Sequence, residues 1–224
     1  MPIFVKNLEI EIRMKGNNNK MTGIVITADV IGSSKLTQLE KKKMLHILKE
    51  STKTGQRLMP DLVQEIFQGD SIQGVSRQGI RQGLRHALQI MTMFRMNDLN
   101  IRVAVGIGEI HLNEERVALS DGPAFVRSGR GLEGLKKKAG NFLSIATGDA
   151  DRDAEWNVHC LSLNYLYGRC TPLQAQALFH SLNDQTQTQI GRKLKITQPT
   201  VQQRLQAAGW PVIKAMIGRF ESLY

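Results

Sequence analysis

The order of strand and helix patterns in the first two thirds of the chain limits what it can fold into. Residues 22–29 form a β-branched run typical of a buried strand, and residues 100–112 alternate between apolar and other side chains as a strand does. Residues 62–76 read as two strands joined by a tight turn, while residues 33–58 and 77–96 have helical periodicity. The order βαββαβ predicts a ferredoxin-like fold, in which one four-stranded antiparallel sheet carries both helices on one face.

The remainder of the chain changes in character near residue 150. A helical pattern at 122–138 and a strand pattern at 142–147 extend the first unit, and no strand is predicted beyond them. Five short helical patterns follow, at 153–168, 172–182, 186–195, 197–208 and 210–222. We therefore predict an α+β, ferredoxin-like domain over residues 21–150 and an all-α domain over residues 151–224. Residues 1–20 are predicted to be an N-terminal extension, either an extra strand or a segment ahead of a start at Met21.

Net charge, cysteine content and hydropathy indicate where the protein functions and what it could bind. The 224-residue chain carries a net charge of +10 and has two cysteines. No apolar run approaches the roughly 20 residues that a membrane helix needs, so we expect a cytoplasmic protein with reduced thiols and no membrane partner. A basic chain suits nucleic acid or other phosphates, although a solvated basic surface without a partner is the simplest alternative.

Two aspartates lie at points that the predicted sheet would bring together. Asp29 ends the first strand and Asp70 lies in the turn before the third, and these strands are central neighbours in a ferredoxin-like sheet. Adjacent carboxylates repel, and a divalent cation relieves the repulsion. We predict Asp29 and Asp70 as ligands of Mg²⁺ or Mn²⁺ with a nucleoside triphosphate, and Gly32, Ser33 and Ser34 as phosphate ligands at the start of the next helix. The alternative is that Asp29 caps this helix and Asp70 is only a turn residue.

Four sequence blocks carry a family resemblance over about residues 22–147. These blocks, "ITADVIGSSKL", "FQGDSIQG", "IRVAVGIGEI" and "SDGPAFVRSGRGLE", resemble the SatD family of bacterial proteins, which is similar to the catalytic palm of class III adenylate and guanylate cyclases. The resemblance implies that Asp29 and Asp70 are catalytic metal ligands, that Arg130 meets the triphosphate in the transition state, and that the chain forms a homodimer. Two positions depart from the cyclase pattern, because Ile66 replaces the base-selecting lysine and Val126 replaces the ribose-binding asparagine.

The segment "QTQTQIGRKLKITQPTVQQRLQAAGW", residues 185–210, has the spacing of a helix-turn-helix. Apolar residues at 190, 194, 196, 201 and 205 would form its core, while Lys195 occupies the turn position that glycine usually fills. We predict that Gln198, Gln202 and Gln203 contact bases, since glutamine pairs bidentately with adenine. Thr188, Thr197, Thr200 and Arg204 are predicted to contact phosphate. A helix pair that serves only structure or dimerisation is the alternative.

The sequence thus predicts a DNA-binding regulator, in which a cyclase-like palm that binds nucleotide or metal is coupled to a helix-turn-helix on double-stranded DNA. An active nucleotidyl cyclase or nucleotidyltransferase with two-metal chemistry is the main alternative. A scaffold that only binds other proteins is the third.

Overall fold

The computed structural model describes residues 21–113 and 116–224. The strands are β1 (Met21–Val30), β2 (Val63–Phe67), β3 (Ser71–Ser76), β4 (Ile101–Ile110) and β5 (Leu143–Ala146). The helices are α2 (Gln38–Leu58), α3 (Gly83–Arg95), α4 (Pro123–Lys136), α5 (Ala150–Arg169), α6 (Pro172–Leu182), α7 (Gln187–Leu194), α8 (Gln198–Ala207) and α9 (Trp210–Leu223). Short 3-10 turns lie at η1 (Ser33–Lys35), η2 (Ile80–Gln82) and η3 (Val117–Leu119). The N-terminal extension predicted for residues 1–20 lies outside the described residues.

The strands form one mixed sheet with the order β2-β3-β1-β4-β5. β1 lies between β3 and β4 and is antiparallel to both, and β5 is parallel to β4. The first four strands therefore have the antiparallel order that the sequence predicts, and β5 adds a fifth. Because β1 is central, its residues 24–29 are flanked on both sides by neighbouring strands.

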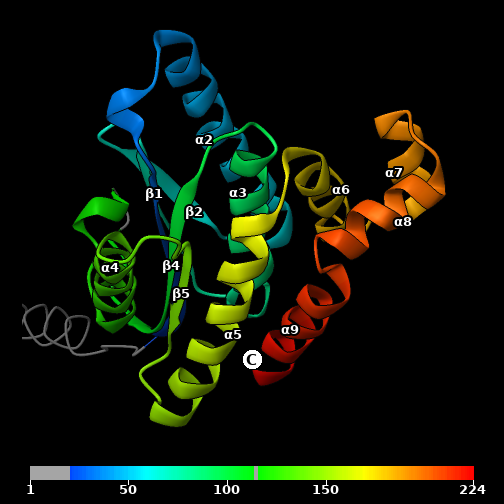
Figure 1. Ribbon diagram of the computed structural model, residues 1–224. Coiled ribbons are helices and arrows are strands. Elements are labelled where there is room, and N and C mark those ends of the chain that lie inside the picture. The colour runs from blue at the N-terminus through cyan, green and yellow to red at the C-terminus, as the bar shows by residue number, and fades with distance from the viewer. Residues whose placement is uncertain (1–20, 114–115) are drawn as a thin grey trace, which may run out of the picture.

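Side chains of β1 alternate between two apolar layers. Ile24 and Ile26 enter the main core with α2 and α3, whereas Val25 joins a smaller cluster that includes Ala124 and Phe125 of α4. Figure 1 shows α4 on one side of the sheet and α2 and α3 on the other. The two helices predicted to share one face do so, and α4 covers part of the opposite face.

Helix α4 packs closely against the centre of the sheet. A Cβ atom added to Gly106 of β4 would lie 2.1 Å from the carbonyl oxygen of Ala124, so only glycine permits this approach. Beside this contact, Thr27 Oγ1 donates to Ser128 Oγ at 3.0 Å. The backbone of α4 is thereby held against β1 and β4.

Two helix starts differ from the prediction. The pattern at 33–58 begins with the 3-10 turn η1, and α2 itself begins at Gln38, where Thr37 and Glu40 form a capping box. The pattern at 77–96 also begins with a 3-10 turn, so that α3 starts at Gly83. The capping box satisfies the first free N–H groups of α2, which explains why that helix starts where it does.

Helix α5 closes the outer edge of β5. Asn164 accepts hydrogen bonds from the N–H groups of Phe142 and Leu143, at 2.9 and 2.7 Å, and donates to the Leu143 carbonyl at 3.1 Å. One side chain therefore pairs the edge groups that a neighbouring strand would otherwise pair. The two cysteines lie near this layer, and burial raises the pKa of Cys160 to about 12 and that of Cys170 to about 11, so neither is a reactive thiol.

Helices α5, α6 and α9 share the main core with the sheet. Trp156 of α5 and Phe220 of α9 are fully buried with ring centroids 5.0 Å apart, and both belong to the cluster that contains Ile24. Arg85 of α3 forms salt bridges with Asp184 and Glu221, at 2.8 and 3.1 Å. The boundary predicted near residue 150 stays a prediction. Of the helices that follow it, α6 and α9 pack on α3, whereas α7 and α8 form a separate apolar cluster beside α6. Among the helices that the structure describes, none combines the length and apolar character needed to cross a bilayer.

Candidate functional site

The strand register brings Asp29 and Asp70 to one end of the sheet. Asp29 of β1 is paired with Ser71 of β3, and Asp70 directly precedes Ser71 in the turn from β2. The Val30 N–H donates to the backbone carbonyl of Asp70 at 3.1 Å, which fixes the turn against the end of β1. Two carboxylates separated by forty residues of sequence thus become neighbours through the antiparallel pairing.

The hydroxyl of Ser71 lies between the two carboxylates. Its oxygen is 3.1 Å from Asp29 Oδ1 and 3.2 Å from Asp70 Oδ1. The two carboxylate oxygens can therefore be no farther apart than these two contacts placed end to end. A serine hydroxyl has one proton, so it can satisfy only one of the two acceptors at a time.

Ser33 belongs to the same group, although not in the role that its sequence predicts. Its hydroxyl donates to Asp70 Oδ2 at 2.5 Å. Gly32 precedes it with a φ of 71°, and Ser34 is exposed. Because residues 33–35 form a three-residue turn and α2 starts later, these residues do not form the helix N-terminus that was predicted to hold phosphate. The alternative role of Asp29 as the cap of that helix is also wrong, because Thr37 caps α2.

Two further residues at this end of the sheet were not predicted from the sequence. Arg102 of β4 is paired with Asp29, and its Nη1 lies 3.7 Å from Asp29 Oδ2. Both side chains are 19% exposed, and the buried Arg102 Nε has no hydrogen-bond partner. Asn100, two residues earlier, likewise has a buried and unpaired Oδ1. The alternation of β4 could have placed Arg102 on the face of Asp29, but only once the pairing of β1 with β4 was known.

The donor set at this site is made of hard oxygen atoms. It comprises the carboxylates of Asp29 and Asp70 and the hydroxyls of Ser33 and Ser71, with one arginine beside Asp29. Within residues 21–113 and 116–224, no group of three acidic, histidine or cysteine side chains gathers as a metal site. A cation held here would therefore keep several positions for water or for ligand oxygens, as Mg²⁺ and Mn²⁺ do.

The other residues implied by the cyclase resemblance lie apart from the carboxylates. Arg130 is exposed on α4 and has no hydrogen bond or salt bridge to Asp29 or Asp70 among the described contacts. Val126, one helical turn earlier, is 49% exposed on the same outward side of α4. Ile66 of β2 pairs with Ile72 and packs against the main core, on the opposite face of the sheet from Asp29.

A second group of polar residues surrounds the turn between α7 and α8. Ile190, Val201 and Leu205 are buried in one cluster, and Lys195 adopts the left-handed conformation, with φ 56°, at the turn. Thr197 caps α8 by accepting from the Thr200 N–H. These are the positions that the sequence predicts for the core, the turn and the cap of this helix pair.

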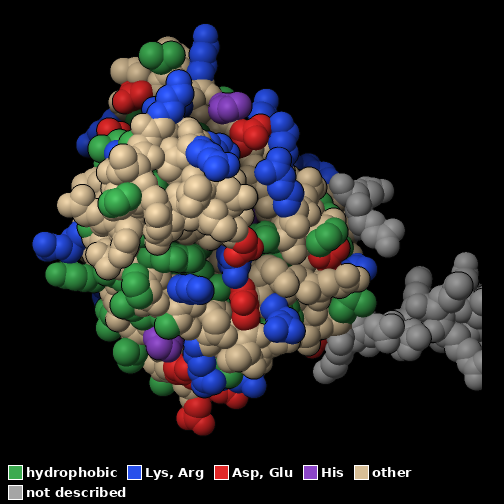
Figure 2. Space-filling model, turned by 90° about the vertical axis from the view of Figure 1, so that its right-hand side faces the viewer, with side chains coloured by type: hydrophobic (Ala, Val, Ile, Leu, Met, Phe, Trp, Pro, Cys, Tyr) green, Lys and Arg blue, Asp and Glu red, His purple; other side chains and the backbone are tan. Residues whose placement is uncertain are grey.

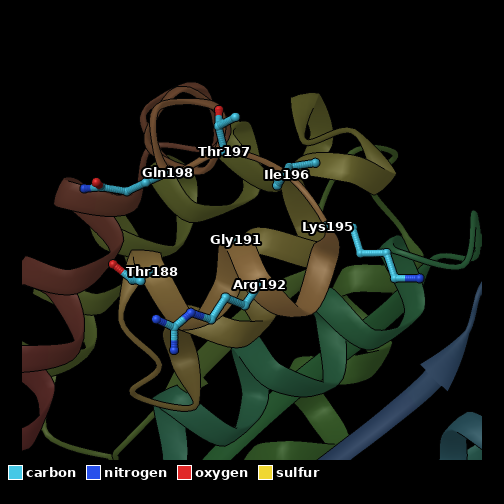
Figure 3. Close-up of a pocket in the computed structure, with 7 residues that line it drawn as sticks. All are labelled: Thr188, Gly191, Arg192, Lys195, Ile196, Thr197 and Gln198. Atoms are coloured by element: carbon cyan, nitrogen blue, oxygen red, sulfur yellow. The ribbon is translucent and has the colours of Figure 1, made fainter.

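A shallow hollow of about 450 Å³ opens beside this turn. Its lining comprises Thr188, Gly191, Arg192, Lys195, Ile196, Thr197 and Gln198 (Figure 3). In Figure 3 the Arg192 side chain extends toward Thr188, whereas the Lys195 side chain extends away from it. The two cations were not among the predicted contacts, although the basic last turn of α7 could have indicated Arg192.

The predicted contact residues of α8 are distributed around its solvent side. Gln198, Gln202 and Gln203 are exposed, while Thr200 and Arg204 are half-buried. Gln198 Nε2 donates to Gln187 Oε1 at 3.2 Å, so its amide is already oriented by α7. The two other glutamines leave their amides free to face a partner along the helix.

Comparison with known proteins gives only distant structural similarity. No protein-family model matches this chain, and no curated protein does. A bacterial light-regulated adenylyl cyclase is similar at 15% identity and a TM-score of 0.44, over 56% of this chain and 75% of that chain. The active GGEEF domain of a diguanylate cyclase from Vibrio cholerae is similar at 14% identity and a TM-score of 0.41, over 61% and 89% of the two chains. The guanylyl cyclase Cya2 is similar at 15% identity and a TM-score of 0.42, over 56% and 74%. At this level the functions of those proteins do not extend to this chain.

Proposed function

We propose that this protein is a cytoplasmic regulator that binds a divalent cation and a nucleotide at the Asp29 and Asp70 site, and double-stranded DNA through α7 and α8. The observation that carries the first part is the placement of both carboxylates on the single hydroxyl of Ser71. Such a pair is costly unless a cation or a proton neutralises it. Mg²⁺ or Mn²⁺ suits this oxygen donor set, and when bound it would supply positive charge that attracts phosphate oxygens.

Arg102 supports a phosphate ligand beside the cation. Its guanidinium lies next to Asp29 and keeps a buried N–H donor without a partner. A buried donor left unpaired costs about 1–3 kcal/mol, and a phosphate oxygen is an acceptor that would remove this cost. We therefore infer that the two aspartates hold the cation, while Arg102 holds nucleotide phosphate.

The polar groups around this site favour nucleotide binding over turnover. Ile66 and Val126 offer no hydrogen bonds to a base or a ribose at the positions where the cyclase resemblance requires them. Arg130 faces outward on α4, so it would reach a triphosphate only on a second copy of the chain, as a homodimer of the SatD or class III cyclase type would allow. An active nucleotidyl cyclase is the alternative, and release of pyrophosphate from a triphosphate would establish it.

Titration with Mn²⁺ tests the cation site. We expect the wild-type protein to bind Mn²⁺, and the Asp29→Asn/Asp70→Asn variant to bind at least about 100-fold more weakly, because both charged ligands are lost. Isothermal titration with Mn²⁺ alone, then with ATP or GTP added, measures both steps. An Asp61→Asn variant is the matched control, because Asp61 is an aspartate bonded to Ser76 and to two backbone N–H groups in a different turn. Equal Mn²⁺ binding by the wild type and the double variant would exclude the site.

DNA binding is supported by the second group of polar residues. The helix pair has the core, turn and cap of a helix-turn-helix, and α8 presents three exposed glutamines that suit adenine edges. Arg192 and Lys195 flank the N-terminal end of α8, where they would reach the phosphate backbone. We propose that α8 reads the major groove.

A gel shift tests this second part. We expect the wild-type protein to bind duplex DNA from the region upstream of the gene. In the Gln202→Ala/Gln203→Ala variant, the binding free energy should weaken by about 1–3 kcal/mol for each base contact removed. The variant should also prefer this duplex over a random-sequence duplex less strongly than the wild type does. Gln78→Ala, an exposed glutamine in the turn after β3, is the control and should bind as the wild type does. No preference for any duplex in the wild-type protein would refute sequence reading by α8.

A further inference from the structure

Helix α2 carries an unusual excess of positive charge on its outer side. Its 21 residues include five lysines and one arginine but only two glutamates. One of these, Glu40, is part of the capping box with Thr37, and the other, Glu50, forms a salt bridge with Lys53 at 2.7 Å. Most of the positive charge on this helix is thus not balanced within it.

The cations are not scattered but follow one line. Lys42, Lys49, Lys53 and Arg57, with the side chain of His46 between the first two, are all exposed and recur at intervals of three or four residues. This spacing places them one above another on the same side of an α-helix, over a length of about 22 Å. We call this set the α2 basic stripe.

The packing of α2 keeps the basic stripe on the solvent side of the helix. Met44, Ile47, Leu48 and Gly55 of the opposite side are buried, so the helix cannot rotate to hide its cations. Within the residues that the structure describes, neither Lys42 nor Lys49 takes part in a salt bridge. Figure 2, which faces the side of the molecule that α7, α8 and α9 form in Figure 1, shows lysine and arginine side chains spread over that side and up to its upper end.

We propose that the α2 basic stripe binds the phosphate backbone of double-stranded DNA. The duplex carries one negative charge per about 1.7 Å of its axis, so a 22 Å line of cations meets a continuous row of phosphates. A membrane surface is the other large polyanion. The apolar side of α2 is buried in the core, however, so it cannot insert into a bilayer. This inference goes beyond the proposed function, because the stripe would contact phosphate in any sequence, whatever α8 reads.

Salt-dependent binding to a random-sequence duplex tests the stripe. We expect Lys42→Glu/Lys49→Glu to weaken binding about tenfold or more, and to reduce the slope of log affinity against log salt by about 2, one unit for each lost phosphate contact. Lys137→Glu/Lys138→Glu is the matched control, because it makes the same change in net charge at exposed lysines after α4. Thermal unfolding of both variants establishes that they are folded.

The outcomes separate the stripe from the other proposals. Loss of binding in the α2 variant, with retention in the α4 control and in Gln202→Ala/Gln203→Ala, supports the stripe even if α8 reads no sequence. Equal losses in the α2 variant and the α4 control, unchanged binding in the α2 variant, or no binding of the wild type at low salt overturns it. Sedimentation with vesicles of phosphatidylglycerol and phosphatidylcholine is the last arm. Retention by vesicles that depends on Lys42 and Lys49, without binding to DNA, overturns the proposal in favour of a membrane surface.

Discussion

Replacing Gly106 by alanine is expected to lower the free energy of unfolding by about 3 kcal/mol, the upper part of the range for overpacking. The added Cβ would lie 2.1 Å from the carbonyl oxygen of Ala124 and 2.7 Å from the backbone nitrogen of Ser128. Both atoms belong to the backbone of α4, so the clash cannot be relieved by rotating a side chain. Helix α4 as a whole would have to move away from β4. Urea unfolding measures the change.

Gly129→Ala on α4 is the control for this substitution. Apart from its chain neighbours and the adjacent backbone of α4, no described atom lies within 4 Å of the Cβ that it would add, so the same chemical change meets open space. Alanine has a higher helix propensity than glycine, and Gly129→Ala should stabilise the protein by about 1 kcal/mol. If both variants change stability in the same direction, the contact between α4 and β4 is looser than described here. The outward direction of Arg130 and Val126 depends on this contact, because it fixes which side of α4 faces the sheet.

The sheet and the meeting of Asp29 with Asp70 could be predicted from the sequence. Alternating apolar residues identify each strand, and the order of strands and helices leaves few ways to connect them. Once β1 and β3 are antiparallel neighbours, the end of one meets the start of the other. The apolar pattern of β1 then determines the register, because a slip of one residue would turn Asp29 to the opposite face.

The remaining members of the site depend on contacts that a sequence does not display. Ser71 and Arg102 reach Asp29 only through the exact pairing of β1 with β3 and β4. The start of α2 could have been predicted, because Thr37 and Glu40 have the spacing of a capping box. The hydroxyls of Ser33 and Ser34, however, also favour a helix start a few residues earlier. Two local signals of similar strength cannot be ranked without the tertiary contact of Ser33 with Asp70.

The packing of the C-terminal helices on the sheet could not be read from their periodicity. An apolar stripe on a helix shows that one side is buried but does not identify what covers it. Trp156 of α5 and Phe220 of α9 complete the core that β1 and α3 begin, so the helices depend on the sheet for their burial.

Acid is expected to destabilise the protein through His86. This α3 residue is fully buried, its Nε2 has no partner, and burial lowers its pKa to about 4, despite an opposing contact with Gln89. The unfolded chain, with an ordinary histidine pKa near 6.5, therefore takes up a proton at a higher pH than the folded protein does. The contribution of His86 to the free energy of unfolding should be fully present above about pH 6.5 and fall by about 3 kcal/mol as the pH drops to about 4.

Other groups titrate in the same range, so the contribution of His86 must be isolated by difference. Burial also lowers the pKa of His180, whereas hydrogen bonds to Glu109 and Asp121 raise the pKa of His111 and act in the opposite direction. Urea unfolding of the wild type and of His86→Gln is compared between pH 4 and 7, so that effects shared by both proteins cancel. The free energy of unfolding should change less steeply with pH in the variant than in the wild type. NMR titration of the His86 ring in the folded wild type is the independent measurement. A folded-state pKa near 6.5 would mean that water reaches the ring and that α2 does not seal it at Gly55, where an added Cβ would lie 2.5 Å from His86 Nε2.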